Sequence, residues 1–319
     1  MSYPFASGKI RVLEKSLPDK VDIDRMVDAE SAEKSFQVFN DTDLSDNLLN
    51  IQPHDFEKAI YADMIQMRDF AKQVSPDPKL FEFLFIKNDF HNIKVLLKSK
   101  MEGKSDYQEK IIPFGVFEAK DIENYIMNED RKSLASELFT KSLDKIMKAP
   151  SLDKVDPICD KEYFNTLIGY TKKIKSNFIT QLLISEIDFS NLRLALRVKD
   201  NIKDLHISGG NISSKKLAEL QEGKDDKVVE YLKSKLTRSE LKIFENYFTE
   251  RKLWQFEKAV DDVLLAHLKE ARKISFGPEV IVAYIKAKEI AFRNIRLIMT
   301  ARLNGVEPII IKERIRNVF

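Results

Sequence analysis

The apolar residues of this 319-residue chain recur at steps of three and four, a spacing that places them on one face of an α-helix. The clearest case is residues 278–305, a segment that opens with a proline and closes with a glycine. Its apolar stripe consists of Val280, Tyr284, Ala287, Ala291, Ile295 and Ile298. Residues 78–103 likewise begin with a proline and end with a glycine. Each segment is predicted to form one helix of about 25 residues.

A third long helix is expected over residues 176–198, and shorter helices fill most of the remaining chain. Their expected ranges are 8–17, 21–38, 54–74, 118–148, 152–175, 213–222, 225–236 and 238–272. Nine glycines and ten prolines leave little of the turn chemistry that β-hairpins need. We therefore predict an all-α fold.

One ten-residue motif occurs three times, each time within one of the predicted long helices. It reads DFHNIKVLLK from Asp89, DFSNLRLALR from Asp188 and AFRNIRLIMT from Ala291. Its asparagines are 99 and 103 residues apart, at Asn92, Asn191 and Asn294. Such self-similarity at a nearly fixed period is typical of a chain built from repeated supersecondary units.

Two weaker anchors keep the same order upstream of each asparagine. The first is an apolar residue, an acid and a lysine: Phe56-Glu57-Lys58, Leu152-Asp153-Lys154 and Phe256-Glu257-Lys258. The second is an apolar residue in a short polar segment: Met26, Ile122 and Leu217. These anchors predict three similar helical repeats, residues 1–105, 106–205 and 206–319.

The repeated asparagine requires an explanation, because its side chain competes for backbone hydrogen bonds and is unfavourable inside a helix. One interpretation is that each asparagine bonds a neighbouring helix or loop and fixes the register of its own unit. The other is a shared ligand-binding ring. Basic residues stand beside the asparagines, at Lys94, Lys98, Arg193, Arg197 and Arg296. They could form a charge lattice between repeats or line a hollow that grips an acidic partner.

The net charge is only +2, which argues against nucleic acid as a partner. The three predicted repeats differ, however, with 15 basic and 18 acidic residues in the first, 16 and 17 in the second, and 22 and 16 in the third. The excess in the third repeat leads to the hypothesis that it attracts an acidic partner, and that Lys312, Arg314 and Arg316 contribute to assembly.

No pattern typical of a catalytic, cofactor or metal site occurs. The four histidines are scattered, the glycine-rich phosphate motifs are missing, and Cys159 is the single cysteine. We therefore expect no enzyme activity, no metal, no cofactor and no small-molecule substrate. Aromatic residues at helical spacing are expected in the core, namely Trp254, Phe81, Phe83, Phe85 and Phe90. Charged residues interrupt every apolar stretch, and the first residues lack a secretory signal, so the chain is expected to be cytoplasmic and not to span a membrane.

Four segments together resemble the C subunit of the archaeal and bacterial V-type (A-type) ATPases, the counterpart of the d subunit of eukaryotic vacuolar ATPases. They are residues 3–15, 88–98, 182–199 and 278–305. The resemblance implies a funnel of three helical units around a pseudo-threefold axis. It also implies a non-catalytic rotor spacer, peripheral to the cytoplasmic face of the membrane, between the central stalk of the ATP-hydrolysing head and the membrane proteolipid ring. The alternative left open by the residues is a free-standing helical-repeat scaffold that binds a protein partner.

Overall fold

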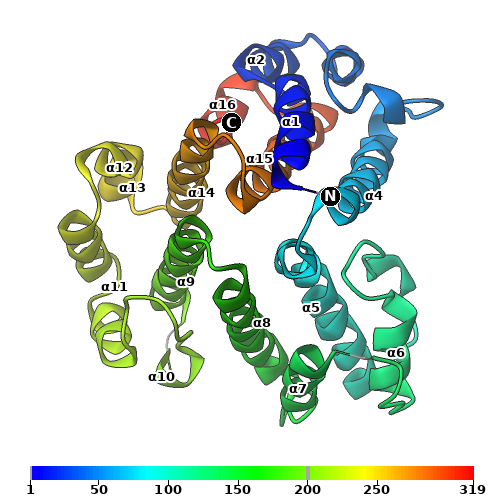
Figure 1. Cartoon of the computed structure of the whole chain (residues 1–319). Coiled ribbons are helices and arrows are strands. Elements are labelled where there is room, and N and C mark those ends of the chain that lie inside the picture. The colour runs from blue at the N-terminus through cyan, green and yellow to red at the C-terminus, as the bar shows by residue number, and fades with distance from the viewer. Residues whose placement is uncertain (1, 135, 199–201) are drawn as a thin grey trace. The chain divides into compact units, whose positions relative to one another are not determined.

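The computed structural model describes residues 2–134, 136–198 and 202–319, and every regular element among these residues is a helix (Figure 1). The α-helices are α1 (Tyr3–Leu13), α2 (Lys20–Asp28), α3 (Ala32–Gln37), α4 (Phe56–Val74), α5 (Pro78–Glu102), α6 (Ala119–Met127), α7 (Glu137–Ile146), α8 (Leu152–Ile174), α9 (Asn177–Arg197), α10 (Ile202–Leu205), α11 (Ser214–Lys235), α12 (Arg238–Ile243), α13 (Glu245–Glu250), α14 (Leu253–Lys269), α15 (Pro278–Leu303) and α16 (Pro308–Arg314). The short 3-10 helices are η1 (Glu14–Ser16), η2 (Val38–Asp41), η3 (Ser45–Asn47), η4 (Pro53–Asp55), η5 (Gln108–Lys110) and η6 (Glu270–Lys273). The all-α prediction is confirmed.

The chain divides into two compact units. One joins Met1–Pro76 with Val229–Phe319, and the other is Asp77–Val228. These limits differ from those of the predicted repeats, because α5 packs with α6 and α8, and α15 packs with α2, α3 and α4. The three-repeat organisation stays a prediction, and its residues 1, 135 and 199–201 lie outside the described part.

In the unit that contains both ends of the sequence, α15 is the central helix. It packs against α1, α2, α3, α4, α14 and α16 (Figure 1). The predicted apolar stripe of α15 is buried along its whole length. A helix with neighbours on so many sides buries more than one stripe, and Val282, Ala283 and Ile285 are buried as well.

In the unit Asp77–Val228, α5 packs along α8 and also contacts α6, while α8 contacts α7 and α9. Aromatic side chains fill the space between these helices, with the ring of Phe90 5.7 Å from that of Phe139 and 5.6 Å from that of Tyr163. The four predicted core phenylalanines of α5 are buried. Trp254, in the other unit, is only partly buried, with the guanidinium of Arg314 5.0 Å from its ring.

The three long helices form where the sequence predicts them, and α4 and α8 begin at the anchors Phe56 and Leu152. The segment 118–148, predicted as one helix, is instead two, α6 and α7. The chain turns after Met127, where Glu129 takes a left-handed backbone conformation with φ of 56°. The segment 21–38 is likewise divided, because the hydroxyl of Ser31 accepts from the amide of Lys34 and starts α3.

The predicted ranges 213–222, 225–236 and 238–272 were also wrong in detail. The expected break near residue 223 does not occur, since α11 is continuous across Gly223. The expected single helix 238–272 is divided into α12, α13, α14 and η6, and the left-handed Arg251, with φ of 58°, ends α13. In addition, α1 begins at Tyr3, ahead of the predicted start at residue 8. Local turn chemistry, which periodicity does not detect, explains the divided ranges.

Candidate functional site

Each repeated asparagine holds the backbone of one later residue by two hydrogen bonds. The amide nitrogen of Asn92 donates to the carbonyl of Ile112 at 2.8 Å, and its oxygen accepts from the amide of Ile112 at 2.8 Å. Asn191 binds Ile207 in the same way, at 2.8 and 3.0 Å. Asn294 binds Arg316 at 2.9 Å in both directions. We call this arrangement the asparagine clamp.

The clamp explains why asparagine recurs inside long helices. All three side chains are fully buried, and a buried amide with both its donor and its acceptor occupied avoids the cost of an unsatisfied polar group. The prediction that each asparagine bonds a neighbouring loop is confirmed. With the predicted limits, Asn294 fixes its own unit, because Arg316 lies within 206–319, whereas Ile112 and Ile207 lie at the start of the repeat that follows 1–105 and 106–205. Because each clamp uses both polar atoms, the ligand-binding ring has no support.

In the first two copies of the motif, an aspartate one helical turn before the asparagine also binds the segment that follows the long helix. The oxygens of Asp89 accept from the amides of Val116 and Phe117 at 2.7 and 3.2 Å. The oxygen of Asp188 accepts from the amides of Asn211 and Ile212 at 2.7 and 3.0 Å.

A glycine precedes each attached segment, at Gly115 and Gly210. A Cβ atom at these positions would lie 2.2 Å from Asp89 Oδ1 and 2.3 Å from Asp188 Oδ1. Both glycines are therefore required by the close approach of a carboxylate to the backbone.

The third copy differs, because Ala291 stands where the other copies have aspartate. A cavity of about 10 Å³, roughly the space of one water molecule, lies beside Ala291 and is lined in part by Leu17 and Pro18. The amide of Asn317, next to the clamped Arg316, instead donates to Asp262 Oδ1 at 2.6 Å.

Ion pairs join the long helices to helices of the following copy. Lys94 and Lys98 of α5 lie 2.6 Å from Asp160 and Asp156 of α8, respectively. Arg296 of α15 lies 2.9 Å from Glu57 at the start of α4. Each of these three bases pairs with an acid in another predicted repeat, as the interpretation as a charge lattice expects. The pairs are half-exposed, so each contributes at most about 1 kcal/mol to stability.

The same junction between the third and the first copy contains a buried charge cluster. Nζ of Lys288, in the middle of α15, lies 2.9 Å from an oxygen of Asp43 and 2.7 Å from an oxygen of Asp63 on α4. Burial raises the pKa of Asp63 to about 6 despite the positive charge of Lys288. Burial alone would lower the pKa of Lys288, but the charges of Asp43 and Asp63 raise it above its usual value. The sequence signal for this cluster was a lysine within an apolar helix, which the sequence analysis missed.

The basic residues of the C-terminal segment are also engaged within the chain. Lys312 lies 2.7 Å from an oxygen of Asp28, Arg316 lies 3.0 Å from an oxygen of Asp261, and Arg314 covers Trp254. Together with Lys288 and Arg296, these contacts account for part of the excess charge of the third copy. The hypothesis that Lys312, Arg314 and Arg316 attract an acidic partner is not tested by these contacts and stays a prediction, because Lys312 and Arg314 are still exposed.

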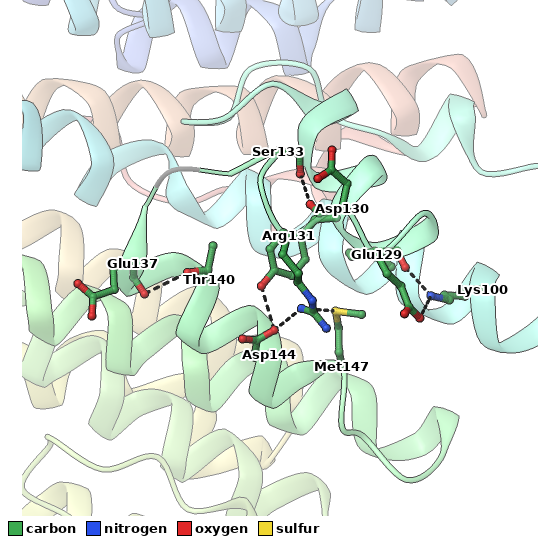
Figure 2. Close-up of polar contacts among 11 residues, drawn as sticks. Lys100, Glu129, Asp130, Arg131, Ser133, Glu137, Thr140, Asp144 and Met147 are labelled. Carbon is green, nitrogen blue, oxygen red and sulfur yellow. Dashed lines mark hydrogen bonds and ion pairs between the residues drawn. The ribbon is translucent and has the colours of Figure 1, made fainter.

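A cation near the end of a long helix binds the end of a neighbouring helix in two copies. Nζ of Lys100 donates to the carbonyl of Ile126 in α6 at 2.6 Å and lies 3.3 Å from Glu129, as Figure 2 shows for the latter contact. Arg302 donates to the carbonyl of Ala29, directly after α2. Cations at a helix C-terminus interact favourably with its unpaired carbonyls. The corresponding Lys199 lies outside the described residues.

The segment between α6 and α7 is held by Arg131. Its guanidinium pairs with Asp144 of α7 and lies 3.8 Å from the sulfur of Met147 (Figure 2). It also covers the ring of Tyr125 at 4.7 Å, and the hydroxyl of Tyr125 donates to Asp144 at 2.9 Å. These contacts fix the turn that separates the two helices.

The described residues offer no evident reactive centre. Among residues 2–134, 136–198 and 202–319, no group of three or more metal-ligating side chains is placed to hold an ion. Cys159 is fully buried, and burial raises the pKa of its thiol to about 12, which keeps it in the unreactive protonated form. Within the same ranges, no helix is both long and apolar enough for a membrane span.

Comparison with known proteins gives one consistent result over nearly the whole chain. Residues 6–314 match the family described as ATP synthase (C/AC39) subunit. The C subunit of the V-type sodium ATPase of Enterococcus hirae is 21% identical over an alignment that spans 100% of this chain and 99% of that protein. The C subunit of the A-type ATP synthase of Methanocaldococcus jannaschii is 23% identical, with 96% and 84% covered. The C subunit of the V-type ATP synthase of Thermus thermophilus is 23% identical, with 75% and 77% covered. On the extent of the family match, the chain belongs to the ATP synthase (C/AC39) subunit family, whose members are parts of an ATPase complex rather than enzymes in themselves.

Proposed function

We propose that this protein is the rotor spacer of a V-type or A-type ATPase. In this role it receives the central stalk of the ATP-hydrolysing head on one side and rests on the membrane proteolipid ring on the other, at the cytoplasmic face of the membrane. It transmits torque for ion transport and performs no chemistry. The family supports membership of the complex, and the junctions described above support the mechanical role.

The observation that carries the proposal is the repeated junction. In each copy an asparagine in the long helix clamps the segment that follows that helix. The helix α5 contacts α6 and α8, and α15 contacts α2, α3 and α4, so the third copy meets the first as the first meets the second. We propose that residues 1–105, 106–205 and 206–319 are arranged in this cyclic order around a pseudo-threefold axis, as a funnel.

Such a junction suits a part that carries a load. A clamp with two hydrogen bonds fixes both the position and the direction of the held backbone, and a buried bond is protected from competition with water. Ion pairs from one long helix to the next copy add further attachment points. Large, preformed surfaces are also what a rotor part needs when it binds its partners through area rather than through one pocket.

The decisive experiment is co-purification of the chain with a candidate central-stalk pair and with the detergent-solubilised proteolipid ring. The proposal expects both to be retained. Omission of the chain from the reassembled complex should leave ATP hydrolysis by the head intact and abolish ATP-driven ion transport in vesicles. Retention of neither partner would favour the alternative of a free-standing scaffold. Ion transport that persists without the chain would contradict the role in torque transmission.

A further inference from the structure

A hollow of about 440 Å³ lies where the end of α15 meets the starts of α3 and α16. Its wall includes Leu303, Val306 and Pro308, and its rim carries the carboxylates of Glu30, Glu33 and Glu307. The next two residues of α16 after Pro308, Ile309 and Ile310, have exposed side chains. We call the hollow together with these two isoleucines the α15–α16 surface.

We propose that the α15–α16 surface is a docking site for a basic, amphipathic polypeptide segment of a partner protein. The inference rests on the proposed function only for the origin of that partner, which would be another subunit of the ATPase complex. The binding chemistry itself, lysine or arginine against the carboxylates and an apolar side chain against the wall, follows from the surface alone.

The first argument is the charge that remains after internal contacts. The single cation of the wall, Arg302, is engaged with the carbonyl of Ala29. Within the described part of the chain, Glu30, Glu33 and Glu307 are exposed and form no ion pair. The hydroxyl of Ser31 and the nearby backbone amide lower the pKa of Glu33, so its carboxylate stays charged. The three carboxylates outnumber the one guanidinium, whose charge the neutral carbonyl of Ala29 does not cancel, so the surface has a net negative charge that a cationic segment complements.

The second argument is the pattern of exposed apolar side chains. The side chain of Leu303 is 40% exposed, that of Ile309 67% and that of Ile310 47%. Single exposed apolar residues need no explanation, but here Leu303 lines the hollow and the two isoleucines directly follow its lining residue Pro308, a grouping typical of an interaction site.

The third argument comes from the repeat. Leu303 is the ninth residue after Asn294, and the ninth residue after Asn92 is Met101, which is 39% exposed. Two residues beyond each stands a glycine in the left-handed conformation, Gly103 with φ of 66° and Gly305 with φ of 68°. An exposed apolar side chain thus recurs at one place in two copies, just before the chain turns. This recurrence favours a shared role in contact over chance exposure.

The sign of the charge at the α15–α16 surface differs from the sign that the earlier hypothesis requires, because an acidic partner needs a basic surface. The third predicted repeat has an excess of cations, but Lys288, Arg296, Arg302 and Lys312 are bound within the chain. Another cation, Lys34, lines a neighbouring hollow of about 530 Å³, which shares Glu30 with the first hollow. The net charge at the α15–α16 surface is negative, so a basic segment is the partner that fits.

The test uses two synthetic helical peptides with leucine on one face and either lysine or glutamate on the other. Fluorescence anisotropy should show that the full chain binds the lysine peptide, more weakly as salt rises, and does not bind the glutamate peptide. The variant Glu33→Gln/Glu307→Gln should bind the lysine peptide about tenfold more weakly at low salt. Leu303→Ser should also weaken binding.

The matched control is Asp106→Asn/Glu109→Gln, which removes two exposed charges from the other unit and should leave binding unchanged. Equal loss in both double variants would overturn the proposal, because the attraction would then be general. Preferential binding of the glutamate peptide would overturn it too. Circular dichroism confirms that each variant is folded.

The experiments distinguish a failure of the docking proposal from a failure of the proposed function. If the lysine peptide does not bind while the wild-type chain still retains the central-stalk pair or the ring, the surface is refuted and the function stands. If the peptide binds through Glu33 and Glu307 while neither partner is retained, the function is refuted and the surface stands. If Glu33→Gln/Glu307→Gln loses one partner and keeps the other, the lost partner supplies the basic segment.

Discussion

An oxygen of Asp63 and Nζ of Lys288 are 2.7 Å apart, and this buried ion pair joins α4 to α15 across more than two hundred residues of sequence. A buried charge costs free energy unless it is paired, so the two residues depend on each other. The same lysine also reaches Asp43. The contact is therefore a sensitive probe of the junction between the third copy and the first.

Replacement of Lys288 by methionine should destabilise the protein by about 3–5 kcal/mol, because two acidic groups would be left in the interior without a cation. Urea unfolding followed by the fluorescence of Trp254, the single tryptophan, reports on the unit that contains this cluster. The matched control is Arg296→Met in the same helix, which breaks an exposed pair with Glu57 and should cost at most about 1 kcal/mol. Equal costs for the two variants would contradict the assigned role of burial.

The stability contributed by Asp63 should depend on pH. Its pKa is about 6 in the folded protein and near 3.8 when unfolded, so the folded state binds the proton more tightly. The resulting stabilisation is fully present below pH 3.8 and is lost as the pH rises through 6. Asp63→Asn removes this dependence. Relative to wild type, the variant should gain up to about 3 kcal/mol between pH 4 and pH 7.5, as measured by urea unfolding at each pH. A constant difference would contradict the raised pKa.

Removal of an asparagine clamp should be costly although only one small side chain changes. Asn92→Ala would leave the amide and the carbonyl of Ile112 without their partner, at a cost of about 2–4 kcal/mol. Asn92→Asp keeps the acceptor and loses the donor, so it should fail as well. Hydrogen exchange should show faster exchange of the amide of Ile112 in the alanine variant. Unchanged protection there would mean that the clamp does not hold the segment.

The close approach at Gly115 predicts a coupled pair of mutations. Gly115→Ala should destabilise the protein, because the new Cβ would lie 2.2 Å from Asp89 Oδ1. In the background Asp89→Ala the same change should cost much less, a difference that a double-mutant cycle measures. Gly8→Ala is the control, since nothing lies within 4 Å of its Cβ position in α1, and it should be neutral or slightly stabilising. Additive effects at Gly115 and Asp89 would refute the coupling.

The periodicity of apolar residues, together with the proline and glycine residues at the helix ends, was sufficient to predict the long helices. The apolar stripe of α15 and the left-handed glycines after α5 and α15 are local signals, and local signals can be read from one sequence. The division of 118–148 at Glu129 depends on a residue that adopts a left-handed backbone without being glycine, and no pattern indicates it. For that reason element boundaries in the shorter segments were wrong.

The candidate junction was predictable only in part. The repetition of Asn92, Asn191 and Asn294 indicated a polar role, and the clamps confirm it. The partners of these residues could not be predicted, because they lie 16 to 22 residues away and are recognised through backbone atoms. The pairing of Lys288 with Asp43 and Asp63 joins distant parts of the chain, and one sequence alone does not report such contacts.

The asparagine clamp binds the backbone N–H and C=O groups of its partner residue, a pair of groups that every residue except proline possesses. Ile112, Ile207 and Arg316 accordingly share neither size nor polarity, yet all three are held in the same way. A segment held in this way can change its side chain at the held position without loss of the clamp, as long as the asparagine is retained. Under the three-repeat prediction, the segments can therefore differ widely in sequence while the asparagines of the long helices keep the clearest signal of the repeat.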